Sequence, residues 1–162
     1  MVRILAATDF SAESRPALDY AAHMVQQCGG KMYLLHAIEP GMLDVAGRMT
    51  ADDIAVGFGI VEPVATAAYV GNVLAAADER AKKLAAEIAE QWDIPVYGKA
   101  EETEDVVDCV HAFCERHNIT TLVIGNRHHS LLTSILLGNT AERLVRHARI
   151  PVTVVPCKTA VK

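Results

Sequence analysis

The sequence predicts an α/β protein built on one parallel sheet, because short apolar runs alternate with longer segments of helical periodicity along its 162 residues. The runs Val2–Ala7 and Met32–Ile38 carry almost no charge, which suits strands covered on both faces. Helix-like segments separate successive runs, as parallel βαβ units require. Right-handed crossovers then favour a doubly wound five-stranded sheet of order 3-2-1-4-5, with helices on both faces.

The first part of the chain reads as strand, helix and strand. Val2–Ala7 is the first strand, and Ser11 is a natural N-cap for a helix that reaches about Gln27. The apolar face of this helix consists of residues at helical spacing, namely Ala17, Leu18, Ala21, Ala22 and Val25. The pair Gly29 and Gly30 ends the helix, and Met32–Ile38 forms the second strand.

Between about Glu39 and Val64, Gly and Pro residues interrupt any long period, so we expect an irregular insertion, either a lid or a mobile surface loop. The elements after it are expected at Ala65–Trp92 (helix), Val96–Ala100 (strand), Glu104–His117 (helix), Thr120–Ile124 (strand), from Gly138-Asn139-Thr140 onward (helix) and at Val152–Val155 (strand). Residues 1–162 are therefore expected to form one domain with an insertion at about 39–64.

Polar residues follow the first and fourth predicted strands. Thr8 and Asp9 come after the first, and the turn from Gly125 to Ser130 comes after the fourth. In the predicted order these strand ends lie beside the point where the chain reverses direction, which is where doubly wound sheets bind ligands. A strand, a glycine turn and a helix N-terminus at Gly138 also make an anion cradle, because free N–H groups and the helix dipole point the same way.

Composition and charge argue against several classes of function. Hydrophobic residues make up 51% of the chain, and a net charge of −5 with 5% aromatic residues gives no footprint for nucleic acid. No apolar run is long enough for a bilayer and the N-terminus lacks the features of a secretory leader, so we expect a cytoplasmic location and no membrane insertion. The four cysteines form no Cys-x-x-Cys pair and are expected to be reduced thiols.

Candidate catalytic and metal-binding residues do not form a recognisable set. His36 lies inside an apolar strand and is interpreted as a packed, hydrogen-bonded core histidine. His128 and His129 are adjacent, and neighbouring residues in a turn rarely share a metal ion, so no metal site is predicted. No nucleophile elbow accompanies Asp9, Ser11 and His36, and the chain has neither a P-loop nor a dinucleotide fingerprint, so no catalytic residue is predicted.

Several short stretches spread over nearly the whole chain share one pattern, namely ATDFS at 7–11, LLHAI at 34–38, VIGNR at 123–127, LLG at 136–138, AERLVRHA at 141–148 and PVTVV at 151–155. Together they resemble the universal stress protein family. The resemblance implies the five-stranded α/β fold and a homodimer formed through the last strand, Val152–Val155. In one branch of the family it also implies an adenine nucleotide, ATP or AMP, with or without Mg²⁺, at the switch point.

The nucleotide-binding branch carries Gly, two residues, Gly, nine residues, Gly and then Ser or Thr. Gly125 and Gly138 keep the first and third glycines, while His128 stands at the second and Asn139 at the hydroxyl position. The resemblance implies Asp9 at the ribose or adenine and the backbone of Ala37 at the adenine edge. The full set of predicted nucleotide-binding residues is Ala7, Thr8, Asp9, Ala37, Ile124, Gly125, Arg127, His128, His129, Gly138, Asn139 and Thr140.

Glu101 to Val106 carries a run of carboxylates where that branch has glycine and proline, and these charges favour a monophosphate or an empty site. Three functions therefore stay open. The first is a dimeric, non-enzymatic stress-response module that binds an adenine nucleotide and signals to an unknown protein partner. The second is a protein-interaction module of the same fold without nucleotide, in which His128 blocks the cradle. The third is slow ATP hydrolysis.

Overall fold

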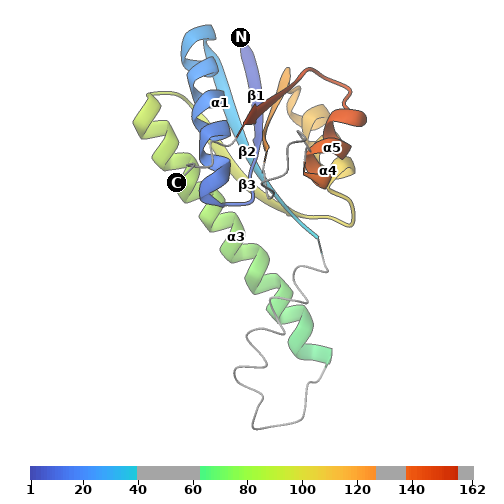
Figure 1. The fold of residues 1–162 in the computed structure, drawn as a ribbon. Coiled ribbons are helices and arrows are strands. Elements are labelled where there is room, and N and C mark those ends of the chain that lie inside the picture. The colour runs from blue at the N-terminus through green and yellow to red at the C-terminus, as the bar shows by residue number, and fades with distance from the viewer. Residues whose placement is uncertain (40–62, 127–137, 157–162) are drawn as a thin grey trace, which may run out of the picture.

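A computed structural model of the chain describes residues 1–39, 63–126 and 138–156. Its centre is a five-stranded sheet of order β3-β2-β1-β4-β5, in which all neighbouring strands are parallel. The strands are β1 (Val2–Ala7), β2 (Gly30–Ile38), β3 (Val96–Glu102), β4 (Thr121–Asn126) and β5 (Val152–Pro156). The predicted fold class and strand order are therefore confirmed (Figure 1).

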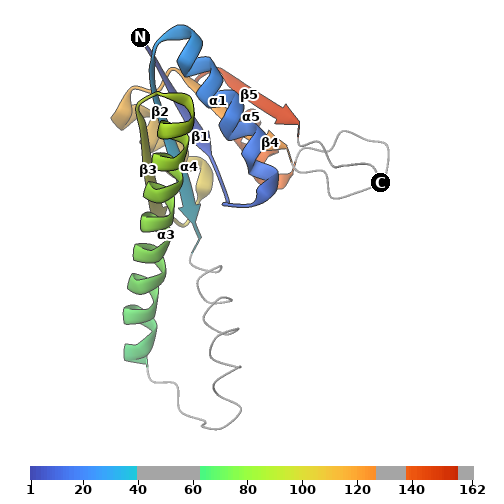
Figure 2. The ribbon, with the colours of Figure 1, turned by 90° about the vertical axis from the view of Figure 1, so that its left-hand side faces the viewer.

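Helices cover both faces of the sheet (Figure 2). The helical elements are η1 (Ala12–Ser14), α1 (Arg15–Cys28), α3 (Pro63–Trp92), α4 (Val106–His117) and α5 (Asn139–Arg146). Side chains of α1 and α3 pack on one face, and side chains of α4 and α5 pack on the other. Within the described ranges no helix is long and apolar enough to cross a membrane.

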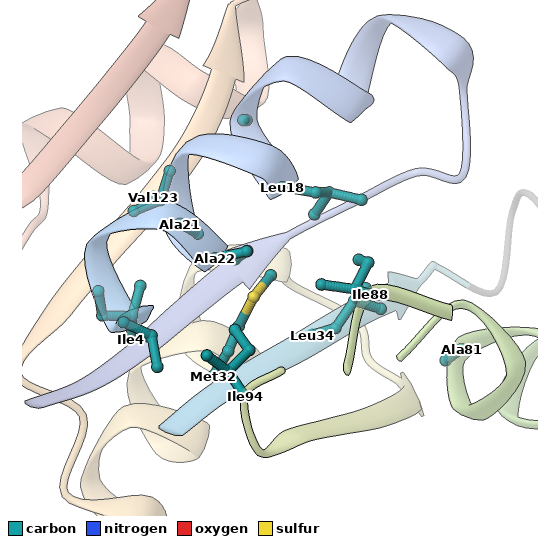
Figure 3. Close-up of a cluster of buried hydrophobic side chains, with 13 residues drawn as sticks. Ile4, Leu18, Ala21, Ala22, Met32, Leu34, Ala81, Ile88, Ile94 and Val123 are labelled. Atoms are coloured by element: carbon teal, nitrogen blue, oxygen red, sulfur yellow. The ribbon is translucent and has the colours of Figure 1, made fainter. Parts of the chain in front are cut away.

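Alternation along the strands sends neighbouring residues into different cores. Ile4 and Ala6 of β1 belong to the core under α1 and α3, where Leu18, Ala21 and Ile88 meet the sheet (Figure 3). The residue between them, Leu5, belongs to the core under α4 and α5, as do Val110, Phe113 and Leu144. Burial on both faces explains why the strands read as nearly uncharged runs.

Local signals set several helix ends. Asp105 caps α4, because its Oδ1 accepts hydrogen bonds from the Val107 and Asp108 N–H groups at 2.7 and 3.2 Å. Gly29 ends α1 with a φ of 67°, a conformation that glycine adopts without strain. Gly98 on β3 has a different role, since a Cβ there would lie 2.1 Å from the Ala81 carbonyl oxygen of α3. The helix therefore packs directly on the strand backbone.

Some local predictions differ from the structure. Ser11 does not cap a helix through its side chain, because its hydroxyl donates to Asp9 Oδ1 at 2.6 Å and the 3₁₀ turn η1 precedes α1. Gly125 does not end β4, because both Gly125 and Asn126 pair with β5. β3 also continues past Ala100 to Glu102, paired with the end of β2. The predicted insertion lies largely at 40–62, outside the described residues.

Candidate functional site

A cavity of about 330 Å³ lies at the carboxyl ends of β1, β2 and β4 and beneath α4 and α5. Most of the residues predicted to bind nucleotide line it, namely Ala7, Thr8, Asp9, Ala37, Ile124, Gly125, Gly138, Asn139 and Thr140. The other predicted residues, Arg127, His128 and His129, lie outside the described part of the chain. The strand order brings the first set together, since β1 and β4 are neighbours at the switch point.

One wall of the cavity is apolar. It consists of side chains from β2, β4, α4 and α5, namely Leu35, Ile124, Val106, Val110, Ala141 and Leu144. Sequence reasoning did not select most of these residues for the site, because their spacing is that of core positions and they do belong to the core or pack against it. A wall of this kind suits the faces of a flat, uncharged ring.

A polar part of the lining belongs to the turn after β1. Asp9 Oδ1 accepts hydrogen bonds from the backbone N–H of Ser11 at 3.0 Å and from its hydroxyl at 2.6 Å, which fixes the carboxylate at the end of the strand. Glu13, which sequence reasoning missed, adds a second carboxylate to the lining.

The buried hydroxyls of Thr8 and Ser14 tie both ends of this turn together at 2.9 Å. Ser14 Oγ also donates to the Ser11 carbonyl oxygen at 2.8 Å, so its only proton is engaged there. Thr8 must therefore donate to Ser14, and Thr8 Oγ1 in turn accepts the Phe10 N–H at 3.0 Å. We call Thr8 and Ser14 the hydroxyl pair. Their hydrogen bonds run in one direction through the turn, from the Phe10 N–H to Thr8, from Thr8 to Ser14 and from Ser14 to the Ser11 carbonyl oxygen.

Helix α5 begins at the cavity. Gly138 occupies its N-cap position without a side-chain cap, and Asn139 and Thr140 open the first turn. The Gly138 carbonyl oxygen accepts the Glu142 N–H at 2.8 Å, so the helix is regular from its start. Its first N–H groups and the positive end of its dipole are at the cavity edge, where they favour an anionic group.

Gly125 lines the cavity from β4, but the space around it is not tight in the described structure. A Cβ added there would lie 3.7 Å from the Ala17 Cβ and 3.8 Å from the Glu13 carbonyl oxygen, which are ordinary contacts. The added atom would point towards η1 and α1. Gly125 therefore permits a small side chain at this position, and larger ones would press on η1 and α1.

Two carboxylates of the run that starts at the end of β3, Glu101 and Asp105, are engaged with arginines, and the run's carboxylates do not line the cavity. Both oxygens of Glu101 accept hydrogen bonds from Arg116, at 2.8 and 2.7 Å. Asp105 pairs with Arg143 while it caps α4, and the hydrogen bond from Arg143 lowers the pKa of Asp105. Of residues 101–106, only Val106 lines the cavity. These pairings weaken the expected repulsion of a polyphosphate by this run.

His36 is packed and hydrogen-bonded, as its position in an apolar strand predicted. Its Nδ1 lies 2.8 Å from the Thr8 carbonyl oxygen and therefore carries the proton that it donates. Burial lowers the pKa of His36, and the nearby Arg80 charge lowers it further. The residue borders the cavity, but strand alternation places its ring on the α3 side of the sheet, where it packs against the Phe10 ring in a tilted contact with the centroids 4.2 Å apart.

Among the described residues, no group of three or more His, Cys, Asp or Glu side chains is placed to hold a metal ion. Cys109 and Cys114 are buried, and burial raises the pKa of each thiol to about 11. These two thiols are therefore protonated at neutral pH and lie in the core under α4.

Comparison with known proteins agrees with this architecture. A model of the universal stress protein family matches residues 1–156. No curated protein sequence matches the chain significantly. A universal stress protein family structure from Burkholderia pseudomallei is 20% identical, with a TM-score of 0.61 and 95% of each chain covered.

Two further solved structures of similar fold were determined with bound nucleotides. A universal stress protein in complex with cAMP is 16% identical, with a TM-score of 0.61, and the match covers 97% of this chain and 98% of that one. The universal stress protein from Archaeoglobus fulgidus in complex with dAMP is 17% identical, with a TM-score of 0.56 and coverage of 95% and 97%. At these identities the likeness establishes the fold.

Proposed function

This chain belongs to the universal stress protein family, and we propose that it is a regulatory module that binds an adenine nucleotide, AMP or ATP, in the cavity at the switch point. The observation that carries the proposal is the composition of that cavity. An apolar wall, a fixed carboxylate and an open helix N-terminus border one space of about 330 Å³, which is within the range of small-ligand sites.

Each part of a nucleotide has a matching part of the cavity. The base fits between the apolar side chains of β2, β4 and α4, such as Leu35, Ile124 and Val110. Asp9 accepts hydrogen bonds and so suits the ribose hydroxyls, which donate them. The first N–H groups of α5, after Gly138, suit a phosphate. The nucleotides in the two structural neighbours support the same ligand class.

Calorimetric titration of the purified full chain with AMP, ATP and GMP tests the proposal. We expect Asp9→Asn to weaken AMP binding by roughly tenfold or more, because a hydrogen bond to a charged group is lost. Asp19→Asn is the matched control, since Asp19 pairs with Arg15 on the surface of α1 away from the cavity. Absence of AMP and ATP binding at millimolar concentration would refute the proposal and favour a protein-interaction module without nucleotide.

The variant His128→Gly tests whether His128, which stands at the second glycine of the nucleotide-binding pattern, obstructs or binds the phosphate. If the histidine obstructs the phosphate cradle, the variant binds ATP more tightly than the parent protein. If the histidine donates to phosphate, the variant binds ATP more weakly. Following ATP over time in the same samples, with and without Mg²⁺, measures any hydrolysis.

We also propose that the module acts as a homodimer through β5. This strand is at one edge of the sheet, and Val152, Thr153, Val154 and Val155 are each only partly buried. An apolar edge strand with unpaired backbone groups favours pairing with a second copy. Light scattering after size exclusion tests this: we expect a dimer for the parent chain and a monomer for Thr153→Arg, and a monomeric parent at all concentrations would contradict the proposal.

A further inference from the structure

Phe10, in the turn after β1, has a backbone conformation that bulky residues rarely adopt. Its φ is 62°, in the left-handed region that normally favours glycine, asparagine or aspartate. Such a conformation persists only where the surrounding contacts determine it. Phe10 directly follows Thr8 and Asp9, which line the cavity. Whatever holds Phe10 therefore also fixes the position of Asp9.

Two sets of contacts hold Phe10, one from its own turn and one from helix α3, which packs on the same face of the sheet. Within the turn, the Phe10 N–H donates to Thr8 Oγ1 at 3.0 Å and so joins the hydroxyl pair. From helix α3, Arg80 Nη2 donates to the Phe10 carbonyl oxygen at 3.2 Å. Both backbone polar groups of Phe10 are thus engaged, the N–H by Thr8 of its own turn and the carbonyl oxygen by Arg80 of α3.

Two side chains also contact the Phe10 ring. The Arg80 guanidinium carbon lies 4.7 Å from the ring centroid, a cation–π distance. The His36 ring lies 4.2 Å away on β2, and its Nδ1 donates to the Thr8 carbonyl oxygen at 2.8 Å. Arg80, Phe10 and His36 therefore form a continuous chain of contacts that ends on Thr8, a residue of the cavity wall.

We infer that Phe10 and Arg80 are positioning residues of the cavity, which hold the turn carrying Asp9 and thereby couple the cavity to helix α3. The inference deepens the proposed function and, for its ligand-dependent part, rests on it. Ligand binding at Asp9 requires the turn in this conformation, and the Arg80 contacts stabilise the same conformation. Because coupling between two such equilibria is reciprocal, a bound nucleotide must in turn stabilise the contacts of Arg80 with the turn.

The test uses the full chain with two measurements, AMP affinity and backbone amide exchange with and without AMP. In the parent protein we expect AMP to slow exchange at Phe10 and Ser11 and in α3 around Arg80. Arg80→Ala should weaken AMP binding by roughly threefold to tenfold, the size expected for losing a cation–π contact and a hydrogen bond, and should abolish the AMP effect on α3. Arg80→Lys keeps the charge but lacks the planar guanidinium, so its AMP affinity should lie between that of the parent and that of Arg80→Ala.

Lys83→Ala is the matched control, because Lys83 is another exposed cation of α3. It should change neither AMP affinity nor exchange in the turn. Phe10→Gly is a second variant, since glycine accepts the positive φ but lacks the ring. If the ring positions the turn, this variant should lose AMP affinity although the backbone strain is relieved.

The two proposals fail in different ways. If the parent chain binds neither AMP nor ATP, the proposed function is wrong, but the positioning role is still tested without ligand: Arg80→Ala must then speed amide exchange at Phe10 and Ser11 by at least about threefold relative to Lys83→Ala. If the parent binds AMP and Arg80→Ala matches Lys83→Ala in affinity and in exchange, the positioning role is overturned while the nucleotide site stands.

Discussion

Asp78 on α3 is predicted to stabilise the protein at neutral pH and to lose this effect in acid. β3 is an edge strand, and the Ala100 N–H on that strand donates to Asp78 Oδ1 at 3.0 Å. Two lysines also contact the carboxylate, Lys82 at 3.0 Å and Lys99 at 3.1 Å. The Ala100 hydrogen bond is the main reason that the pKa of Asp78 falls from 3.8 to about 2, and the lysines lower it further.

The size of the effect follows from this difference in pKa. A fall from 3.8 to about 2 corresponds to roughly 2.4 kcal/mol of stability at about 1.36 kcal/mol per pH unit. Solvent screens part of it, so we expect about 1–2 kcal/mol. Because the pKa is lower in the folded state, the stabilisation is complete above pH 3.8 and is lost as the pH falls towards 2.

Urea unfolding of the parent chain and of Asp78→Asn measures the effect between pH 7 and pH 2.5. Asparagine keeps an oxygen that accepts the Ala100 N–H but carries no charge, so the comparison isolates the contribution of the Asp78 charge to stability. The parent should be more stable by about 1–2 kcal/mol at pH 7, and the difference should shrink towards zero in acid. Glu79→Gln is the control: Glu79 contacts Lys82 at 2.7 Å, but its side chain is 74% exposed, so about 0.5 kcal/mol or less is expected.

A stability difference between parent and Asp78→Asn that is the same at pH 7 and at pH 2.5 would refute this reasoning. So would a carboxyl carbon resonance of Asp78 that titrates near 3.8, the value without neighbours. Asp78→Ala adds a further check, because it also removes the acceptor of the Ala100 N–H. It should cost about 1 kcal/mol more than Asp78→Asn, and this extra loss should persist in acid.

Three further predictions concern the core and the strand ends. Gly98→Ala should destabilise the protein by about 3 kcal/mol or more in urea unfolding, because the added Cβ meets the α3 backbone at 2.1 Å, whereas Gly125→Ala should change stability by less than about 1 kcal/mol. Since burial lowers the pKa of His36, stability should fall as pH drops below 6.5, and His36→Asn should flatten this dependence; an unchanged slope would contradict the assignment. Peptide-level mass spectrometry after brief thiol alkylation at neutral pH should find Cys28 modified and Cys109 and Cys114 protected until urea is added, because the latter are buried with pKa values of about 11.

The predicted elements agree with the structure where local pattern and tertiary packing demand the same thing. Val2–Ala7 is the first strand in the prediction and in the structure, because its residues face the two apolar cores alternately. The sheet has the order that right-handed crossovers favour, a preference that needs no side-chain detail. The cavity residues at the ends of β1 and β4 could be predicted from the sequence for the same reason, since the strand order brings these ends together.

The sequence failed where the partner of a residue is distant. The charge of Glu101 predicts repulsion, but its carboxylate is paired with Arg116. Asp105 likewise meets Arg143, a residue of another helix. Such pairings depend on how the helices settle on the sheet, which no short window of sequence contains.

By itself, therefore, the sequence predicted the number, type and order of the strands and the strand ends at which the cavity lies, because the period of apolar residues and the handedness of crossovers favour this arrangement. The tertiary structure decided the chemistry of that place. Only packing turns the core residues Leu35, Val110 and Leu144 into an apolar wall, and only the contacts of Arg80 and His36 hold Phe10 at a positive φ beside Asp9. Those contacts join residues from separate elements, so they exist only once the sheet and its helices are assembled.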